Sequence, residues 1–164
     1  MTVEVTPFTK KFQQSVEDLI LPIQKEEFEF QLTREEQPDL IDIPGVFQIG
    51  NGNFWVALDG KKVVGTIGVI DISDQQVALK KMFVAREYRG KDVAQTLMST
   101  AVKWCASKKV EKIFLATNAK MKVAQKFYER NGFVEVNKSE LPPTFPITSV
   151  ATNFYRRVIT TRLR

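Results

Sequence analysis

The 164-residue sequence contains no histidine and a single cysteine, Cys105. Histidine is the usual general base and the commonest metal ligand, so its absence excludes Ser-His-Asp and Cys-His catalysis. Zinc sites draw mainly on cysteine and histidine, so no metal site is expected. One cysteine cannot form an internal disulfide, which is typical of the reducing cytoplasm. Any proton transfer must therefore use a carboxylate, tyrosine, lysine, water or a chain terminus.

Long apolar runs are also missing. No stretch approaches the roughly 18–20 apolar residues of a membrane-spanning helix, and the N-terminal MTVEVTPFTKK lacks the apolar core of a signal peptide. We therefore expect a cytoplasmic chain without a membrane partner. The apolar fraction of 43% and the charged fraction of 26% are those of a globular protein, and the length predicts one domain over residues 1–164.

The net charge of +5 is unevenly distributed. Residues 17–42 carry nine acidic and two basic side chains, whereas residues 80–130 carry thirteen basic and four acidic ones. A basic half suits a polyanion and an acidic half suits a cation such as an amine, although both can also be ordinary solvated helix faces. Nucleic acid is the least favoured partner, because the lysines are scattered and no recognised nucleic-acid motif accompanies them.

The chain is organised around residues 78–135, which predict a strand, a basic loop, a helix, a strand, a helix and a final strand. The loop contains Tyr88-Arg89-Gly90-Lys91-Asp92. After it the apolar residues follow a helical period, with Val93, Leu97, Ala101 and Cys105 on one stripe. Because the backbone N–H groups at a helix N-terminus are unpaired, this loop predicts an anion-binding site.

Other patterns predict the remaining elements. Helices are expected over residues 9–28, from 33 to about 39–43, over 92–108 and over 120–131, and strands over 2–6, 54–58, 63–72, 77–85, 112–117, 133–136 and 150–160. Pro22 should bend the first helix, and Thr33 and Glu36 form a capping box for the second. Helix 92–108 is a crossover, so strands 77–85 and 112–117 should be parallel neighbours.

Two motifs in this stretch resemble those of the GNAT acyltransferases, which transfer an acetyl group from acetyl-CoA to an amine. The family's pyrophosphate loop reads Arg or Gln, two residues, Gly, one residue, Gly or Ala; here it reads Arg89-Gly90-Lys91-Asp92-Val93-Ala94. A second pattern, Asn, two residues, Ala, three residues, Tyr, is matched by Met121, Ala124 and Tyr128, and a Gly-Phe pair follows at residues 132–133. The sequence departs from the family at Asp92, where Gly is usual, and at Met121, where Asn is usual.

The resemblance implies an α/β (α+β) fold with a mixed sheet of about seven strands, splayed between the fourth and fifth strands, and about four helices. In this family the pantetheine arm of CoA lies in the splay and pairs like an extra strand. Acetyl-CoA is then the donor substrate, an amine is the acceptor, and no metal takes part. A homodimer is a further expectation, because dimers are frequent in the family.

The same resemblance implies which residues form the site. Those expected to contact acetyl-CoA are Met82, Phe83, Val84, Arg89, Gly90, Lys91, Asp92, Val93, Ala94, Gln95, Asn118, Met121, Ala124 and Phe127. Tyr128 is the expected catalytic acid, which donates a proton to the departing CoA sulfur. On the acceptor side we expect Glu26, Glu27, Glu29 and Phe145, although each glutamate can equally be a surface residue. The base stays open: it is a glutamate acting through water, or there is none.

Three of these positions allow a second interpretation. Asp92, followed by Gln95, fits a helix-capping pattern, so Asp92 is expected to cap the helix until CoA binds and then to rotate away; alternatively, it points to solvent. Tyr128 can be a packed aromatic residue with its hydroxyl at the surface. Cys105 lies on the apolar stripe without a histidine to activate it, so we expect it to pack in the core.

The sequence thus predicts an N-acetyltransferase that moves an acetyl group to a primary amine by direct transfer. The alternative is a GNAT-fold CoA-binding sensor or scaffold without robust catalysis, which the departures at Asp92 and Met121 suggest. The identity of the acceptor and the length of the acyl chain are not encoded in any pattern of this sequence.

Overall fold

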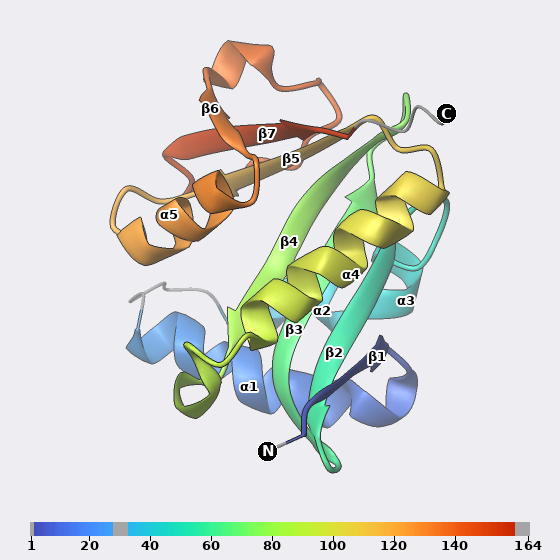
Figure 1. The fold of residues 1–164 in the computed structure, drawn as a ribbon, viewed down its shortest axis with the longest axis vertical. Helices are drawn as coiled ribbons and strands as arrows, with labels where there is room; N and C mark the ends of the chain where they lie inside the picture. The colour runs from blue at the N-terminus through green and yellow to red at the C-terminus, as the bar shows by residue number, and fades with distance from the viewer. Residues whose placement is uncertain (1, 28–32, 160–164) are drawn as a thin grey trace.

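The structure, a computed structural model, describes residues 2–27 and 33–159 and is built on one seven-stranded sheet (Figure 1). The strands are β1 (Glu4–Pro7), β2 (Asn53–Asp59), β3 (Lys62–Asp71), β4 (Gln76–Val84), β5 (Lys112–Thr117), β6 (Val134–Val136) and β7 (Asn153–Val158). Their order is β1-β2-β3-β4-β5-β7-β6; β4 and β5 run parallel and the other neighbours run antiparallel. The predicted mixed sheet, with a parallel pair at its fourth and fifth strands, is confirmed.

Helices cover both faces of this sheet. They are α1 (Gln13–Glu26), α2 (Pro38–Ile41), α3 (Ile43–Val46), α4 (Val93–Ser107) and α5 (Lys122–Arg130), with 3-10 turns at residues 10–12, 34–36, 86–88 and 138–140. In Figure 1, α4 crosses one face of β2, β3 and β4, whereas α1, α2 and α3 pack on the other face. Among the described residues, no helix combines the length and the apolar character needed to cross a membrane.

The N-terminal helical region differs in detail from the prediction. Its first helix begins as a 3-10 turn and continues through Pro22 without a break, while Phe28, its expected end, lies outside the described residues. The capping box is confirmed: the Glu36 N–H donates to Thr33 Oγ1 (3.3 Å), and the Thr33 N–H donates to Glu36 Oε1 (3.0 Å). It opens a 3-10 turn rather than an α-helix, because the residue before Pro38 is kept out of the helical conformation.

The predicted apolar stripe of α4 is the main contact of this helix with the sheet. Val93, Leu97, Ala101 and Cys105 are all buried in one cluster with side chains of β2 to β5. Gly65 on β3 permits the close approach, because a Cβ at this position would lie 2.9 Å from Cδ1 of Leu97. This packing fixes the N-terminus of α4 beside the end of β4.

The strands β4 and β5 pair over a short distance and then diverge. Residues 76–78 lie opposite residues 112–114, and no further pairing between the two strands follows in the part of the chain that the structure describes. The β3–β4 register shifts near Lys81, whose backbone is left-handed (φ 57°), and such a bulge bends the strand. The second half of β4 therefore has one backbone edge that no strand occupies, which is the predicted splay.

The core between α4 and the sheet should carry much of the stability of this fold. Ile67 on β3 is fully buried in it, whereas Ile49 is 56% exposed. We expect Ile67→Ala to lower the free energy of unfolding by about 2–5 kcal/mol, because it removes buried methyl groups and leaves a cavity. Ile49→Ala, the matched control, should change it by less than about 0.5 kcal/mol. Urea denaturation followed by circular dichroism measures both; equal losses would contradict the assignment of the core.

Candidate active site

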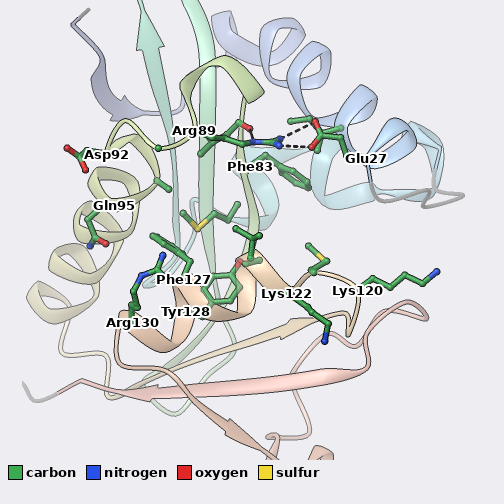
Figure 2. A pocket seen from close by; sticks show the side chains of 18 residues that line it. Glu27, Phe83, Arg89, Asp92, Gln95, Lys120, Lys122, Phe127, Tyr128 and Arg130 are labelled. Atoms are coloured by element: carbon green, nitrogen blue, oxygen red, sulfur yellow. Dashed lines mark hydrogen bonds and ion pairs between the residues drawn. The ribbon is translucent and has the colours of Figure 1, made fainter.

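The diverging strands leave a cavity of about 910 Å³ between β4, α5, the start of α4 and the C-terminal end of α1 (Figure 2). Its lining residues are Ile23, Glu27, Met82, Phe83, Val84, Arg89, Gly90, Asp92, Ala94, Gln95, Lys120, Met121, Lys122, Val123, Ala124, Phe127, Tyr128 and Arg130. A cavity of several hundred Å³ is large enough for a cofactor-sized ligand. It therefore qualifies as the candidate active site.

Most residues predicted to bind acetyl-CoA meet in this cavity. All of them line it except Lys91, Val93 and Asn118, and the predicted acid Tyr128 lines it as well. Val93 is buried in the core beneath α4.

Along Met82–Val84 the unpaired edge of β4 offers backbone N–H and C=O groups, so an extended ligand can add to the sheet there as a further strand.

The structure separates the residues predicted on the acceptor side. Glu27 lines the cavity, whereas Glu26 is exposed outside it. Phe145 is buried in a different cluster with Ala78 and Phe154. Glu29 lies outside the described residues. The acceptor roles of Glu26, Glu29 and Phe145 therefore stay predictions.

Five lining residues were missed by the sequence analysis. They are Ile23, Lys120, Lys122, Val123 and Arg130. Lys120, Lys122 and Val123 adjoin the family position at Met121, and this adjacency was a signal for them. Ile23 and Arg130 gave no such signal, because they reach the cavity only through the way in which α1 and α5 pack beside β4.

The loop after β4 is shaped to receive an anion. Gly90 and Asp92 both have a left-handed backbone (φ 73° and 65°), and alternation of this kind turns successive N–H groups toward one side. Within residues 2–27 and 33–159, none of the N–H groups from Gly90 to Gln95 donates to a protein acceptor. Together with the helix dipole at the start of α4, these groups have the arrangement that the predicted anion site requires.

The capping role expected of Asp92 is wrong. Its side chain makes no hydrogen bond to the start of α4 and points outward, away from Arg89 (Figure 2), because the residue has a left-handed backbone. The Asp92 carbonyl accepts instead from the N–H and the hydroxyl of Thr96 (both 2.9 Å). A ligand can therefore reach the first N–H groups of α4, and the Asp92 side chain does not have to rotate away first.

Gln95 and Asn118, which were both predicted to contact the cofactor, form hydrogen bonds that fix the elements around the cavity. The Gln95 and Asn131 side-chain amides donate to each other (2.9 and 3.2 Å), which ties the start of α4 to the end of α5. Asn118 Nδ2 donates to the Val150 carbonyl (2.6 Å), and Asn118 Oδ1 accepts from the Lys120 N–H (2.9 Å). Asn118 thus stabilises the turn that leads into α5.

Arg89 points across the cavity to α1. Its Nε donates to the Val84 carbonyl (2.9 Å), and its Nη1 and Nη2 donate to Glu27 Oε1 and Oε2 (2.7 and 3.1 Å), as the dashed lines in Figure 2 show. The charge of Arg89 is therefore matched by a carboxylate. The anion site of the loop depends mainly on backbone N–H groups.

Tyr128 supplies a buried phenol to the cavity. The residue is 8% exposed, and its ring packs edge-on against Phe127 (5.9 Å between centroids) and Phe133 (5.8 Å). Its hydroxyl is directed toward β4 (Figure 2). Burial raises the pKa of Tyr128 to about 12, so the hydroxyl keeps its proton at neutral pH. A protonated hydroxyl on the cavity wall can donate a proton to a leaving group.

Cys105 lies in the core, as expected, near the opposite end of α4 from the loop. Burial raises the pKa of its thiol to about 12, which keeps it unreactive.

Among the described residues, no group of three His, Cys, Asp or Glu side chains could hold a metal ion.

A comparison with protein families agrees with this geometry. The family model described as "Acetyltransferase (GNAT) family" matches residues 18–133, which is most of the chain. The chain belongs to the GNAT acetyltransferase family. The family resemblance expected from the loop at Arg89 and from the region of Tyr128 is thereby confirmed.

Solved GNAT structures share the fold. An acetyltransferase of this family from Staphylococcus aureus Mu50 has a TM-score of 0.94 and 34% identity, over 97% of this chain and 100% of its own. The PaiA N-acetyltransferase of Thermoplasma acidophilum, solved with coenzyme A, has a TM-score of 0.75 over 96% of this chain and 99% of its own; at 14% identity this likeness shows the fold alone.

Curated relatives are longer than this chain. The probable N-acetyltransferase camello of Xenopus tropicalis is 30% identical over 134 residues, which are 79% of this chain and 61% of that protein. The matched regions cover 47%, 61% and 54% of the length of the first three curated relatives, so the chain spans about half the length of these proteins. The similarity to them therefore concerns the GNAT region.

The three tyrosines of the chain should titrate late in the folded state. Burial raises the pKa of Tyr128 and of Tyr155 to about 12, and the hydrogen bond to Asp59 raises that of Tyr88. Between pH 10 and 12 the folded protein then holds protons that the unfolded chain has released, so stability falls as pH rises through this range. We expect absorbance at 295 nm to rise only above pH 10. If all three tyrosines of the native protein titrate at about 10, as in the urea-unfolded chain, the burial of Tyr128 is contradicted.

Proposed function

We propose that this chain is an N-acetyltransferase that moves an acetyl group from acetyl-CoA to a primary amine by direct transfer. The observation that carries the proposal is one cavity with two features. The phenol of Tyr128, whose pKa is raised to about 12, lies on its wall, and the N–H groups of residues 90–95, which donate to no acceptor among the described residues, lie at its end. Membership of the GNAT acetyltransferase family supports the same reaction.

The residues present fit acetyl-CoA as the donor. The pyrophosphate would be held by the N–H groups from Gly90 to Gln95, with the charge of Arg130 nearby on the cavity wall. The pantetheine arm would add to the free edge of β4 along Met82–Val84. Asp92 does not block this arrangement, because its carboxylate points outward.

In the transfer step the amine nitrogen attacks the thioester carbonyl carbon, the new C–N bond forms and the C–S bond breaks. The Tyr128 hydroxyl donates its proton to the departing sulfur and regains one from solvent. A backbone N–H at Met82 or Phe83 polarises the carbonyl oxygen. The proton lost by the amine passes to water or to a carboxylate, and no covalent enzyme intermediate is required.

The remaining parts of the proposal concern the setting of the reaction. The acceptor is a primary amine that approaches from the α1 side, where Glu27 lines the cavity. We also propose that residues 1–164 act as one acyltransferase domain in a reducing compartment such as the cytoplasm, which suits the single cysteine. Assembly into a homodimer stays a prediction.

Replacing the proposed acid tests the reaction directly. We expect Tyr128→Phe to lower kcat for thiol release from acetyl-CoA with an accepted amine by about 10²–10³-fold, since general-acid catalysis contributes this much, and to leave acetyl-CoA binding unchanged. Tyr155→Phe, a matched change of a nearby buried tyrosine, should leave kcat within about twofold. A panel of amines decides against the alternative or for it. If the wild-type protein binds acetyl-CoA but none of the amines leads to thiol release, the sensor or scaffold alternative replaces the proposed enzyme.

A change at Asp92 tests the anion loop. Asp92→Gly should tighten acetyl-CoA binding by about fivefold, because it removes a carboxylate whose repulsion of the pyrophosphate across water is worth about 1 kcal/mol. Asp92→Asn removes the same charge but keeps a side chain that tolerates the left-handed backbone, so it should tighten binding equally. Isothermal titration calorimetry measures both. Unchanged or weaker binding by both variants would show that Asp92 has no repulsive effect.

A further inference from the structure

The Arg89 side chain makes three hydrogen bonds to two elements outside its own loop. Its Nε bonds the carbonyl of Val84 at the end of β4 (2.9 Å), and its two Nη atoms bond the carboxylate of Glu27 at the end of α1 (2.7 and 3.1 Å). The residue itself opens the loop that leads to α4. One side chain therefore links the loop, the strand β4 and the helix α1 (Figure 2).

The loop has few bonds of its own beyond this link. On its N-terminal side the Tyr88 hydroxyl donates to Asp59, and the Arg89 N–H donates to the Arg86 carbonyl (3.2 Å). From Gly90 to Asp92 no N–H bonds a protein acceptor in the described ranges. The position of these N–H groups relative to β4 therefore depends on the anchors on either side of them, which are Arg89 before them and the packed start of α4 after them.

Glu27 is well placed to keep that anchor. Its side chain is 17% exposed, and it bonds Arg89 in the bidentate geometry that fits a guanidinium and a carboxylate best. The Arg86 guanidinium lies 3.7 Å from the same carboxylate, so Glu27 also offsets a second cation of the loop. To acceptors in the described part of the chain, Arg89 donates three of its five N–H groups.

We propose that Glu27 is a positioning residue for the cofactor: by pinning Arg89 it keeps the Arg89–Asp92 loop in register with the free edge of β4. The pyrophosphate and the pantetheine arm must meet both features at once, so a displaced loop weakens the binding of the whole molecule. The role differs from the acceptor contact expected from the sequence, because Glu27 acts through Arg89. It rests on the proposed function, since it concerns the binding of acetyl-CoA.

The test is a double-mutant cycle read by calorimetric titration of acetyl-CoA into the wild type, Glu27→Gln, Arg89→Gln and the double variant. We expect Glu27→Gln to raise Kd by about fivefold, which corresponds to about 1 kcal/mol for a partly exposed bidentate pair. In the Arg89→Gln background the same change should have no effect, because its target is gone. Glu35→Gln removes an exposed carboxylate outside the cavity, so it is the matched control, with Kd unchanged.

Steady-state kinetics separates this role from others. A positioning residue for the cofactor raises KM for acetyl-CoA and leaves kcat at saturating acetyl-CoA unchanged. Glu27→Asp, which keeps the charge on a shorter side chain, should restore part of the affinity. Should Glu27→Gln fold poorly by circular dichroism, Glu27→Asp carries the test alone, with an expected rise in KM and an unchanged kcat.

Three results would overturn the proposal. Tighter binding by Glu27→Gln would show that Glu27 competes with the pyrophosphate for Arg89. An equal loss in both backgrounds would show that Glu27 does not act through Arg89, and a fall in kcat at constant KM would place it on the acceptor amine. Failure of the wild type to bind acetyl-CoA is a separate result, which would remove the proposed function itself.

Discussion

The site depends on the separation of two parallel strands. β4 and β5 pair at residues 76–78 and 112–114 and then diverge, so the second half of β4 keeps a free backbone edge. In a fully paired sheet these N–H and C=O groups would bond the neighbouring strand, and no extended ligand could add there. The other functional parts lie around this gap: α5 brings Tyr128 to its wall, and the loop after β4 brings unpaired N–H groups to its end.

The uneven charge of the sequence has a structural explanation as well. Carboxylates of the acidic half pair with cations in Glu17–Arg34 (2.7 Å), Glu27–Arg89 (2.7 Å) and Asp39–Lys81 (3.5 Å). Burial alone raises the pKa of Glu17, but hydrogen bonds from Arg34 and Gln13 outweigh it and leave this pKa below its ordinary value. Glu17–Arg34 ties α1 to the residues after it, and the other two pairs attach the acidic half to β4 and the loop after it, beside any attraction it has for an amine.

Local patterns predicted the parts of the fold whose physics is local. The positions of the strands, the buried stripe of α4 and the capping box at Thr33 depend on residues close in sequence, and the structure has all of them. The prediction for Asp92 was wrong because capping requires an extended backbone at the capping residue, and the loop imposes a left-handed one. The partner of Arg89 could not be predicted, since Glu27 lies 62 residues away and only the packing of α1 brings it near.

The sequence by itself determined most of the helices and strands, the loop at the start of α4 and the family to which the chain belongs, because each depends on a short run of residues. The tertiary structure alone decided where β4 and β5 part, which cavity results, and that Arg89 faces Glu27 rather than solvent. It also decided the pKa of Tyr128, because desolvation depends on what surrounds the ring once helix and sheet have packed. Contacts between residues far apart in the chain arise only on folding, so no local pattern contains them.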